Sequence, residues 1–301
     1  MQRVSIIGCG YTGIRLATRW RDAGATVQGF ATRPDSLRAI ASAGARPVPL
    51  HLDQGGEPGA AVPIELDGHL VYYSVPPAHG APSDSRLERF LEMIRGTPQR
   101  LVYLSTTGVY GDHAGGRVDE NTVPTPQSAR AVRRVAAEAA IRSWADAHSV
   151  SWCILRVAGI YGPGRLPIER LRRGEPAILP QEATPTNRIH VDDLATACVA
   201  AGVAARADRR IYNVTDGSED SLTAYLQRVA RLANLPAPPL VTREHARRTY
   251  TESSWSFLAE SRRVDNRRML GELGFELAYR DLDDGIRASL KEQSREAGET
   301  A

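Results

Sequence analysis

Lysine is almost absent from this chain. Of its 38 basic residues, Lys291 near the C-terminus is the single lysine. Essentially all other positive charge is carried by arginine, whose guanidinium stays protonated at physiological pH. A site that needs a lysine within the body of the chain is therefore excluded.

Cysteine and long apolar runs are also scarce. The three cysteines (Cys9, Cys153 and Cys198) are far apart and lack metal-ligand spacing, so we expect no metal site. Cys153 and Cys198 lie in apolar stretches and are expected in the core. No run approaches the ~20 apolar residues of a membrane span, and a predicted strand begins at residue 3 or 4, leaving no room for a signal peptide. We expect a cytoplasmic protein without membrane contact.

Charge and length set two further bounds. The net charge is only +3 and is spread along the chain, which argues against a nucleic-acid-binding surface. The chain has 301 residues, of which 42% are hydrophobic. This favours one large domain, or two closely packed ones, with a proper core.

The most informative stretch follows the first residues. Residues 4–7 are apolar and predict a buried parallel strand, and a helical pattern begins soon after. Between them, Gly8, Gly10 and Gly13 give the spacing G-x-G-x-x-G. In this setting the first glycine allows a tight turn, the second lets a diphosphate approach, and the third lets the helix pack closely. The predicted dinucleotide contacts are Gly8, Gly10, Tyr11, Thr12 and Gly13.

The second predicted strand, residues 25–30, bears on the choice of cofactor. NAD sites usually place Asp or Glu about 20 residues beyond the glycines to bind the ribose 2′-hydroxyl, whereas arginine suits the 2′-phosphate of NADP. Here Ala31 is followed by Thr32 and Arg33, which favours NADP. In the alternative, Arg33 is a solvated charge, Asp35 reaches the ribose, and NAD is bound.

Strands and helices alternate along most of the chain. Strands are expected at residues 4–7, 25–30, 46–50, 70–75, 100–105, 151–156 and 211–214. Alternation on a repeat of about 25–30 residues predicts an α/β fold with a doubly wound parallel (Rossmann) sheet. Later helices are expected at 222–233, 262–273 and 281–291, with a linker at 236–239 and fraying after residue 291. Asp192 or Asp193 is predicted to cap a helix.

Six motifs occur in order: G-C-G-Y-T-G, S-T-T-G-V-Y-G, L-R-V-A-G-I-Y-G-P-G, I-H-V-D-D-L, I-Y-N-V and E-L-G-F. Over nearly the whole chain they resemble the extended short-chain dehydrogenase/reductase superfamily, the NAD(P)-dependent epimerase/dehydratase group, which acts largely on nucleotide sugars. The glycine loop is closer to that of atypical members. The resemblance implies a Rossmann domain (1–162 and 187–235), a smaller substrate-binding domain (163–186 and 236–301), and a homodimer through helices near 85–95 and 127–148.

The resemblance also implies site residues. Thr106, second in S-T-T-G-V-Y-G, matches the family's catalytic Ser/Thr, which hydrogen-bonds the reacting substrate oxygen. From its chemistry alone, Thr106 could instead cap the end of a strand. Cofactor contacts are implied for Ser74, Val75, Pro76, Ser105, Val157 and Ala158.

The family's central Tyr-x-x-x-Lys pair is missing. In ordinary members the tyrosine and the lysine precede a glutamate of the long helix, and counting back from Glu138 gives Arg130 and Arg134. Because Lys291 is the only lysine, no other register restores the pair. Arg134 could keep the cation's electrostatic and ribose-binding roles. Arg130 cannot exchange protons, but it could bind an anionic group or stabilise an oxyanion; the alternative is a solvated basic helix face.

Two functions stay open. The first is an atypical NADP-dependent reductase or epimerase acting on a small polar or nucleotide-sugar-like substrate, with an unidentified proton donor. The candidates for that donor are Tyr72, Tyr73, Tyr110, Tyr161 and His190. Tyr110 and Tyr161 match family positions that are usually structural and His190 belongs to a helix start, which favours packing over chemistry. The second is an NADP-binding sensor or scaffold that kept the nucleotide site and lost catalysis.

Overall fold

Seven parallel strands form the centre of the computed structural model, which describes residues 1–53, 62–78, 80, 83–252, 255 and 258–299. Their order is β13 (Arg210–Val214), β9 (Ser151–Val157), β7 (Arg100–Thr106), β5 (Leu70–Tyr73), β1 (Arg3–Ile7), β2 (Thr26–Ala31) and β3 (Arg46–Pro49). The chain reverses its direction of winding between β1 and β5, the switch point of a doubly wound sheet. The predicted α/β fold is confirmed, with all seven expected strands in one sheet.

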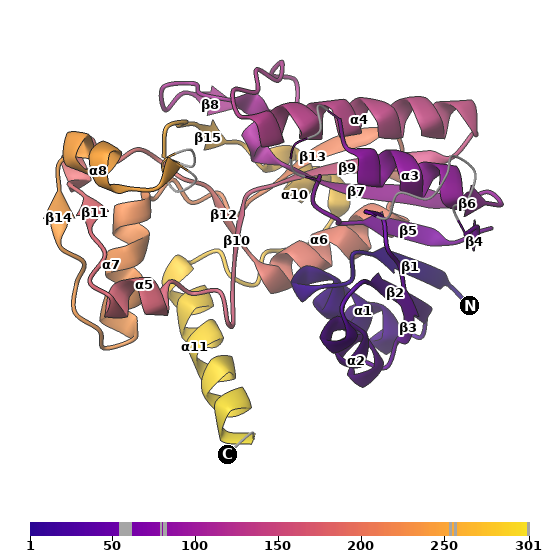
Figure 1. The fold of residues 1–301 in the computed structure, drawn as a ribbon, viewed down its shortest axis with the longest axis horizontal. Helices are drawn as coiled ribbons and strands as arrows, with labels where there is room; N and C mark the ends of the chain where they lie inside the picture. Colours follow the sequence, from indigo (N-terminus) through magenta and orange to yellow (C-terminus); the bar gives the residue numbers. More distant parts are fainter. Residues whose placement is uncertain (54–61, 79, 81–82, 253–254, 256–257, 300–301) are drawn as a thin grey trace.

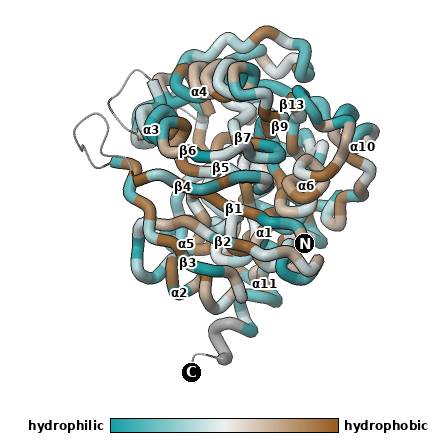
Figure 2. Tube along the Cα trace, turned by 90° about the vertical axis from the view of Figure 1, so that its right-hand side faces the viewer, coloured by the Kyte–Doolittle hydropathy of each residue, from teal (hydrophilic) through white to brown (hydrophobic). Residues whose placement is uncertain are grey.

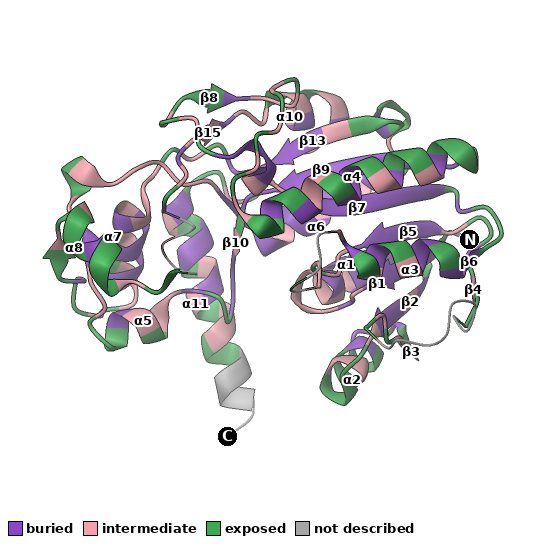
Figure 3. Cartoon of the chain, turned by 45° about the horizontal axis from the view of Figure 1, so that its top comes forward, coloured by how far each residue is buried: buried purple, intermediate pink, exposed green. Residues whose placement is uncertain are grey.

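Helices cover both faces of this sheet (Figure 1). On one face pack α1 (Tyr11–Asp22), α2 (Pro34–Ser42), α6 (Val191–Val203) and α10 (Arg267–Leu273). On the other pack α3 (Ser85–Met93) and α4 (Ala129–Ala147). The inner strands β1, β5, β7 and β9 are buried between these layers (Figure 3), which accounts for their largely apolar sequences, whereas β3 at the edge is mostly exposed. Figure 2 shows the same hydrophobic residues gathered along the central strands and α6.

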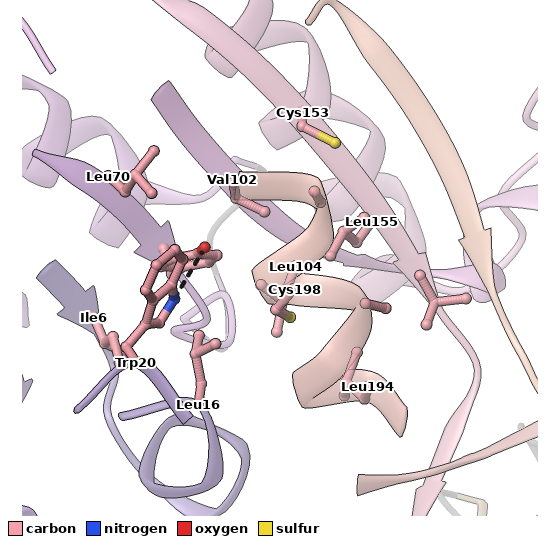
Figure 4. Close-up of a cluster of buried hydrophobic side chains, with 14 of the residues drawn as sticks. Ile6, Leu16, Trp20, Leu70, Val102, Leu104, Cys153, Leu155, Leu194 and Cys198 are labelled. Atoms are coloured by element: carbon pink, nitrogen blue, oxygen red, sulfur yellow. Dashed lines mark hydrogen bonds between the residues drawn. The ribbon is translucent and has the colours of Figure 1, made fainter. Parts of the chain in front are cut away.

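The core on the α1 side explains two of the cysteines. Cys153 and Cys198 are fully buried among Leu155, Leu194 and their neighbours (Figure 4), as predicted. In the same cluster, Trp20 Nε1 donates a hydrogen bond to the Tyr72 hydroxyl at 3.2 Å. Cys9 is also buried, and desolvation raises the pKa of its thiol to about 12, so it holds no thiolate for redox chemistry at neutral pH.

A second lobe stands beside the sheet (Figure 1). It consists of α5 (Ile168–Arg172), β11 (Ala177–Ile178), η2 (Pro180–Glu182), α7 (Leu222–Leu232), β14 (Leu240–Val241), α8 (Arg243–Thr249) and α11 (Leu282–Glu299). The apolar face of α7 is buried against α5, β11 and α11, whereas α10 packs on α6 and β13 of the sheet. At these two helices the packing differs from the expected division of the chain, which placed α7 with the sheet and α10 with the second lobe.

Short parallel pairs complete the architecture. β10 (Gly159–Tyr161) pairs with β12 (Arg188–His190), along the two segments that lead to and from the second lobe. β8 (Arg117–Val118) pairs with β15 (Arg263–Val264), and β4 (Ile64–Glu65) with β6 (Ile94–Arg95). Single turns of 3₁₀ helix follow β7 and α6, as η1 (Thr107–Tyr110) and η3 (Ala205–Ala207).

Several predicted element ends are wrong. The N-cap of α6 is His190, whose ring nitrogen accepts from the Asp192 amide at 3.2 Å, rather than either aspartate. Asp193 is instead buried and accepts from the Ala278 and Tyr279 amides at 2.8 and 3.1 Å. α11 continues to residue 299 rather than ending near 291, and the expected helix at 262–273 begins only after β15.

None of the described helices is long and apolar enough to cross a membrane.

Candidate functional site

The glycine loop lies at the switch point, between the ends of β1 and β5. Gly8 has φ +82°, and a Cβ there would lie 2.8 Å from Val75 Cγ2, so the turn requires glycine. The amides of Gly8 and Cys9 donate to the Phe30 carbonyl at 3.1 and 2.8 Å, which ties the loop to β2. A Cβ on Gly13 would come within 3.2 Å of Cys9 Sγ, so α1 packs close to the loop.

Gly10 leaves open space in front of α1. A Cβ built on it would meet only the Gly8 carbonyl, at 3.9 Å. As the N-cap of α1 it supplies no side-chain acceptor, and the first turn, which contains Tyr11, Thr12 and Gly13, has no acidic residue. A helix end of this kind offers amide donors and a favourable dipole to a phosphate anion. The geometry fits the diphosphate of a dinucleotide.

A pocket of about 240 Å³ opens from the loop toward the end of β2. Six predicted cofactor residues line it: Gly8, Gly10, Thr32, Arg33, Val75 and Pro76. Sequence reasoning missed Ser36, Asp53 and Arg86, which also line it. The signal that could have found Asp53 is its place after the end of β3, since ligands of open α/β sheets bind at the carboxyl ends of the strands.

The acidic residues near this pocket are ion-paired. Asp53 accepts from Arg86 Nε and Nη2 at 2.5 and 2.7 Å, and these hydrogen bonds lower the pKa of its carboxyl group. Asp35, at the start of α2, is paired with Arg38. Arg33 is exposed at the pocket and takes part in no ion pair within the described part of the chain.

Three other predicted cofactor residues make contacts within the protein. Ser74 Oγ donates to the Gly8 carbonyl at 2.9 Å, and the Tyr11 hydroxyl donates to the Pro163 carbonyl at 2.9 Å. Both therefore fix the position of the loop. Ser105 is buried and donates to Glu138 Oε1 at 2.6 Å, within an ion pair between Glu138 and Arg156.

A larger cavity of about 500 Å³ lies between the ends of β7 and β9 and the second lobe. Three predicted site residues line it, namely Thr106, Arg130 and Ala158, and Val157 pairs with Thr106 directly beside them. The other charged residues in its described lining are Arg165, Arg188, Glu260 and Arg262. Four guanidinium groups against one carboxylate make a cationic cavity, which suits an anionic ligand.

Thr106 is both a capping residue at the end of a strand and a residue that lines the cavity. Its Oγ1 accepts from the Gly108 amide at 3.2 Å and so caps η1 at the end of β7. The residue also lines the cavity. Because the backbone contact uses Oγ1 as an acceptor, the hydroxyl proton is left to donate to a ligand.

The two arginines at the positions of the missing pair lie in different surroundings. Arg130 lines the cavity, where partial desolvation lowers the pKa of its guanidinium, with Glu260 opposing and Arg262 adding to that shift. Arg134 Nη1 donates to the Tyr103 hydroxyl at 2.8 Å and to the Leu104 carbonyl at 3.0 Å. Arg134 thus supports β7, and it is not among the described residues that line either pocket.

The candidate proton donors are core residues. All five side chains are buried. Desolvation raises the pKa of the phenols of Tyr72, Tyr73, Tyr110 and Tyr161. It lowers the pKa of the His190 imidazole to about 4. The ring of Tyr161 touches the cavity, but its hydroxyl oxygen is buried against α11, where a Cβ on Gly285 would lie 2.2 Å away. None of the five offers a proton to the cavity.

Comparison with known proteins decides the family. Residues 87–215 match the family described as NAD dependent epimerase/dehydratase. A solved structure of a functionally unknown conserved protein from Silicibacter pomeroyi DSS is 33% identical, with a TM-score of 0.76 over 97% of this chain and 99% of that one. The chain belongs to the NAD-dependent epimerase/dehydratase family.

Two more distant matches extend over nearly the whole chain. Protein YeeZ of Escherichia coli K12 is 27% identical over 294 residues, covering 93% of this chain and 97% of YeeZ. UDP-glucuronic acid 4-epimerase from Bacillus cereus, solved with UDP-glucuronic acid and NAD, is 16% identical with a TM-score of 0.73 over 98% and 99% of the two chains. The second likeness shows a shared fold. Family and fold together support a nicotinamide nucleotide as the ligand of the glycine loop.

Proposed function

We propose that this protein is an NADP-dependent reductase or epimerase-like enzyme acting on an anionic, nucleotide-sugar-like substrate. The observation that carries the proposal is the arrangement of two pockets along one edge of the sheet. The glycine-loop pocket lies at the ends of β1 and β2, and the cationic cavity lies at the ends of β7 and β9. Ligands of open α/β sheets bind along this edge, so one dinucleotide can serve both sites.

The preference for NADP rests on charge at the end of β2. Ala31 offers no acceptor to a ribose hydroxyl, and Asp35 and Asp53 are both paired with arginines. Arg33, exposed at the pocket, supplies the cation that a 2′-phosphate requires, and Ser36 adds a hydroxyl donor. Both features support NADP over NAD.

The choice of substrate rests on the cavity. Its four arginines would be costly to desolvate around a neutral ligand, whereas a diphosphate or carboxylate compensates them. The Bacillus cereus epimerase was solved with UDP-glucuronic acid, an anionic nucleotide sugar. That likeness supports a substrate of the same kind here.

Four residues have distinct parts in the proposed reaction. When bound, the nicotinamide supplies hydride transfer. Thr106 donates its hydroxyl proton as a hydrogen bond to the reacting oxygen, and Arg130 stabilises negative charge that develops there. Arg134 holds the Leu104 carbonyl, and thereby the end of β7 that carries Thr106. Ala158 shapes the wall beside them.

Calorimetry and a turnover assay test this function. We expect NADPH to bind at least about tenfold more tightly than NADH, a difference of about 1.4 kcal/mol. NADPH oxidation, or interconversion of epimers, is expected with at least one member of a panel of nucleotide sugars and small carbonyl compounds, and should fall in Thr106→Ala. Equal affinities for the two nucleotides would contradict the NADP assignment alone.

The second candidate is an NADP-binding sensor or scaffold. It is favoured by the role of Thr106 as a cap and by the burial of every expected proton donor. Tight NADPH binding without turnover across the whole panel would select it. Turnover that depends on Thr106 would exclude it.

A further inference from the structure

The cationic cavity contains one carboxylate among its described lining residues, that of Glu260. Its side chain is 9% exposed, and Oε2 accepts from Arg262 Nη1 at 2.8 Å. Thr106 and Arg130 line the same cavity. We propose that Glu260 exchanges the proton of the reacting substrate oxygen, the step for which the missing tyrosine leaves no residue.

The fold fixes Glu260 beside the end of β7. The Ser261 amide donates to Asp112 Oδ1 at 2.8 Å, and the Ser261 carbonyl accepts from the His113 amide at 3.0 Å. Arg262 Nη1 also donates to the Gly111 carbonyl. Through these contacts, and the pairing of β15 with β8, the chain around residue 260 is bound to the loop that directly follows Thr106 and η1.

The other ionisable groups of the cavity cannot move this proton. Its four arginines stay protonated at any working pH. The hydroxyl oxygens of Tyr161 and Tyr225 are buried away from the cavity, and desolvation raises the pKa of both phenols. Glu260 is therefore the carboxylate of the described lining that is placed to exchange a proton in the cavity.

Two cations lie near the Glu260 carboxylate. Arg262 is in direct contact, and Arg130 faces the cavity from the start of α4, close enough for the charge of Glu260 to act on its pKa. In the oxidation of a substrate alcohol, the O–H bond breaks, its proton goes to Glu260, and its electron pair forms the C=O bond. The hydride from carbon goes to the nicotinamide nucleotide, and reduction runs through the same steps in reverse.

The inference rests on the proposed redox function, and its test separates the two. Glu260→Gln removes the proton acceptor while keeping the side-chain shape. We expect this variant to turn over the substrate that the wild type accepts from the panel at least about 100-fold more slowly, as for loss of a general base. UDP serves as an anionic probe of the cavity, and its Kd by calorimetry should stay equal or decrease, because a negative charge is lost. Glu260→Asp should recover part of the turnover.

Glu219→Gln is the matched control. Glu219 pairs with Arg117 and Arg263 on the same strand pair but is not among the cavity-lining residues, so turnover should stay within about twofold. Glu260→Gln turnover within threefold of wild type would overturn the proposal. Joint loss of turnover and UDP binding would also overturn it, because it would show that Glu260 only holds the arginines in place. A wild type without any turnover overturns the proposed function itself, and this inference with it.

Discussion

The two proposed sites of this molecule, the cofactor end at the glycine loop and the substrate end at the larger cavity, are built in different ways. The glycine loop presents backbone amides and empty space, from a few consecutive residues. The larger cavity presents side chains from stretches far apart in the sequence, among them Thr106, Arg130, Arg188 and Glu260. The first end keeps the glycine pattern, while at the second the sequence resemblance implies Arg130 and Arg134 where the family's tyrosine and lysine would stand.

The difference follows from the chemical groups that each end uses, which are backbone amides at the loop and side chains in the cavity. An amide at a helix terminus is present whatever the side chain, so the loop depends only on glycines that keep space open. Acid–base chemistry depends on single side chains, so one substitution removes it. A family pattern therefore predicts binding at the loop more securely than it predicts the reaction in the cavity.

The largest expected effect distinguishes a loop glycine that leaves room for the cofactor, Gly10, from one that the turn itself requires, Gly8. Gly10→Ala should weaken NADPH binding about 100-fold, roughly 2.7 kcal/mol, because its methyl group takes the open space before α1. The free energy of unfolding should change by only about 1 kcal/mol, the scale of a helix cap. Gly8→Ala is the contrast, because its Cβ would press on Val75 at positive φ and reduce stability as well. Calorimetry and urea unfolding measure the two effects; an unchanged NADPH Kd in Gly10→Ala would contradict the placement of the diphosphate.

Arg134 tests whether the substrate end has kept a cofactor contact. Arg134→Leu leaves the Tyr103 hydroxyl and the Leu104 carbonyl without this donor, and should lower the free energy of unfolding by about 1–3 kcal/mol. The NADPH Kd should remain within about threefold of wild type. Arg142→Leu, on the same helix, is the control and should cost less, because within the described part of the chain Arg142 donates only to the Glu138 carbonyl of its own helix. A strong loss of NADPH affinity in Arg134→Leu would show that the ribose-binding role survives.

Arg33 tests the choice of cofactor. Arg33→Ser should weaken NADPH binding about tenfold, or about 1.4 kcal/mol, and leave NADH binding unchanged, because only NADP carries the 2′-phosphate. Arg38→Ser, in the helix α2 that Arg33 directly precedes, concerns an arginine paired with Asp35 and should change neither affinity appreciably. Equal losses for both nucleotides in Arg33→Ser would place Arg33 near a group that they share.

The smallest effect concerns the contact between the sheet and the second lobe, around Tyr161. Burial raises the pKa of Asp216 to about 6 and lowers that of His190 to about 4. Between about pH 4 and 6, native Asp216 keeps a proton that the unfolded chain releases, so its contribution to stability falls as pH rises. Native His190 lacks a proton that the unfolded chain binds, so its contribution rises with pH.

Asp216→Asn removes one of these two opposed contributions to the pH dependence of stability. The free energy of unfolding of the variant, relative to wild type, should therefore increase from pH 4.5 to pH 6.5, by about 1 kcal/mol. Urea unfolding at several pH values measures it. Parallel profiles for the two proteins would show that the pKa of Asp216 is not raised in the native state.

Local sequence pattern was enough to predict much of the fold and most of the residues proposed for the cofactor end. The first strand, its glycines and Arg33 follow one another in sequence, so their spatial relation is fixed by the single unit of β1, the glycine turn, α1 and β2. The N-cap of α6 was missed because His190 and two aspartates all offer acceptors, and burial of Asp193 against the Ala278 amide decided between them. Glu260 was missed because no local pattern links it to Thr106. The pairing of β15 with β8, together with the contacts of Ser261 and Arg262 with the loop after η1, brings them to one cavity.

A crystal structure of the protein with NADPH tests the central claim most directly, that a retained dinucleotide site delivers the cofactor to a cavity with its own catalytic side chains. We expect the diphosphate at Gly10, the 2′-phosphate at Arg33, and the nicotinamide in the cavity with Thr106 and Glu260. Its C4 should then face a position about 3–3.5 Å from a substrate carbon bound between them. A nicotinamide ring outside that cavity, with the diphosphate still at Gly10, would contradict the account.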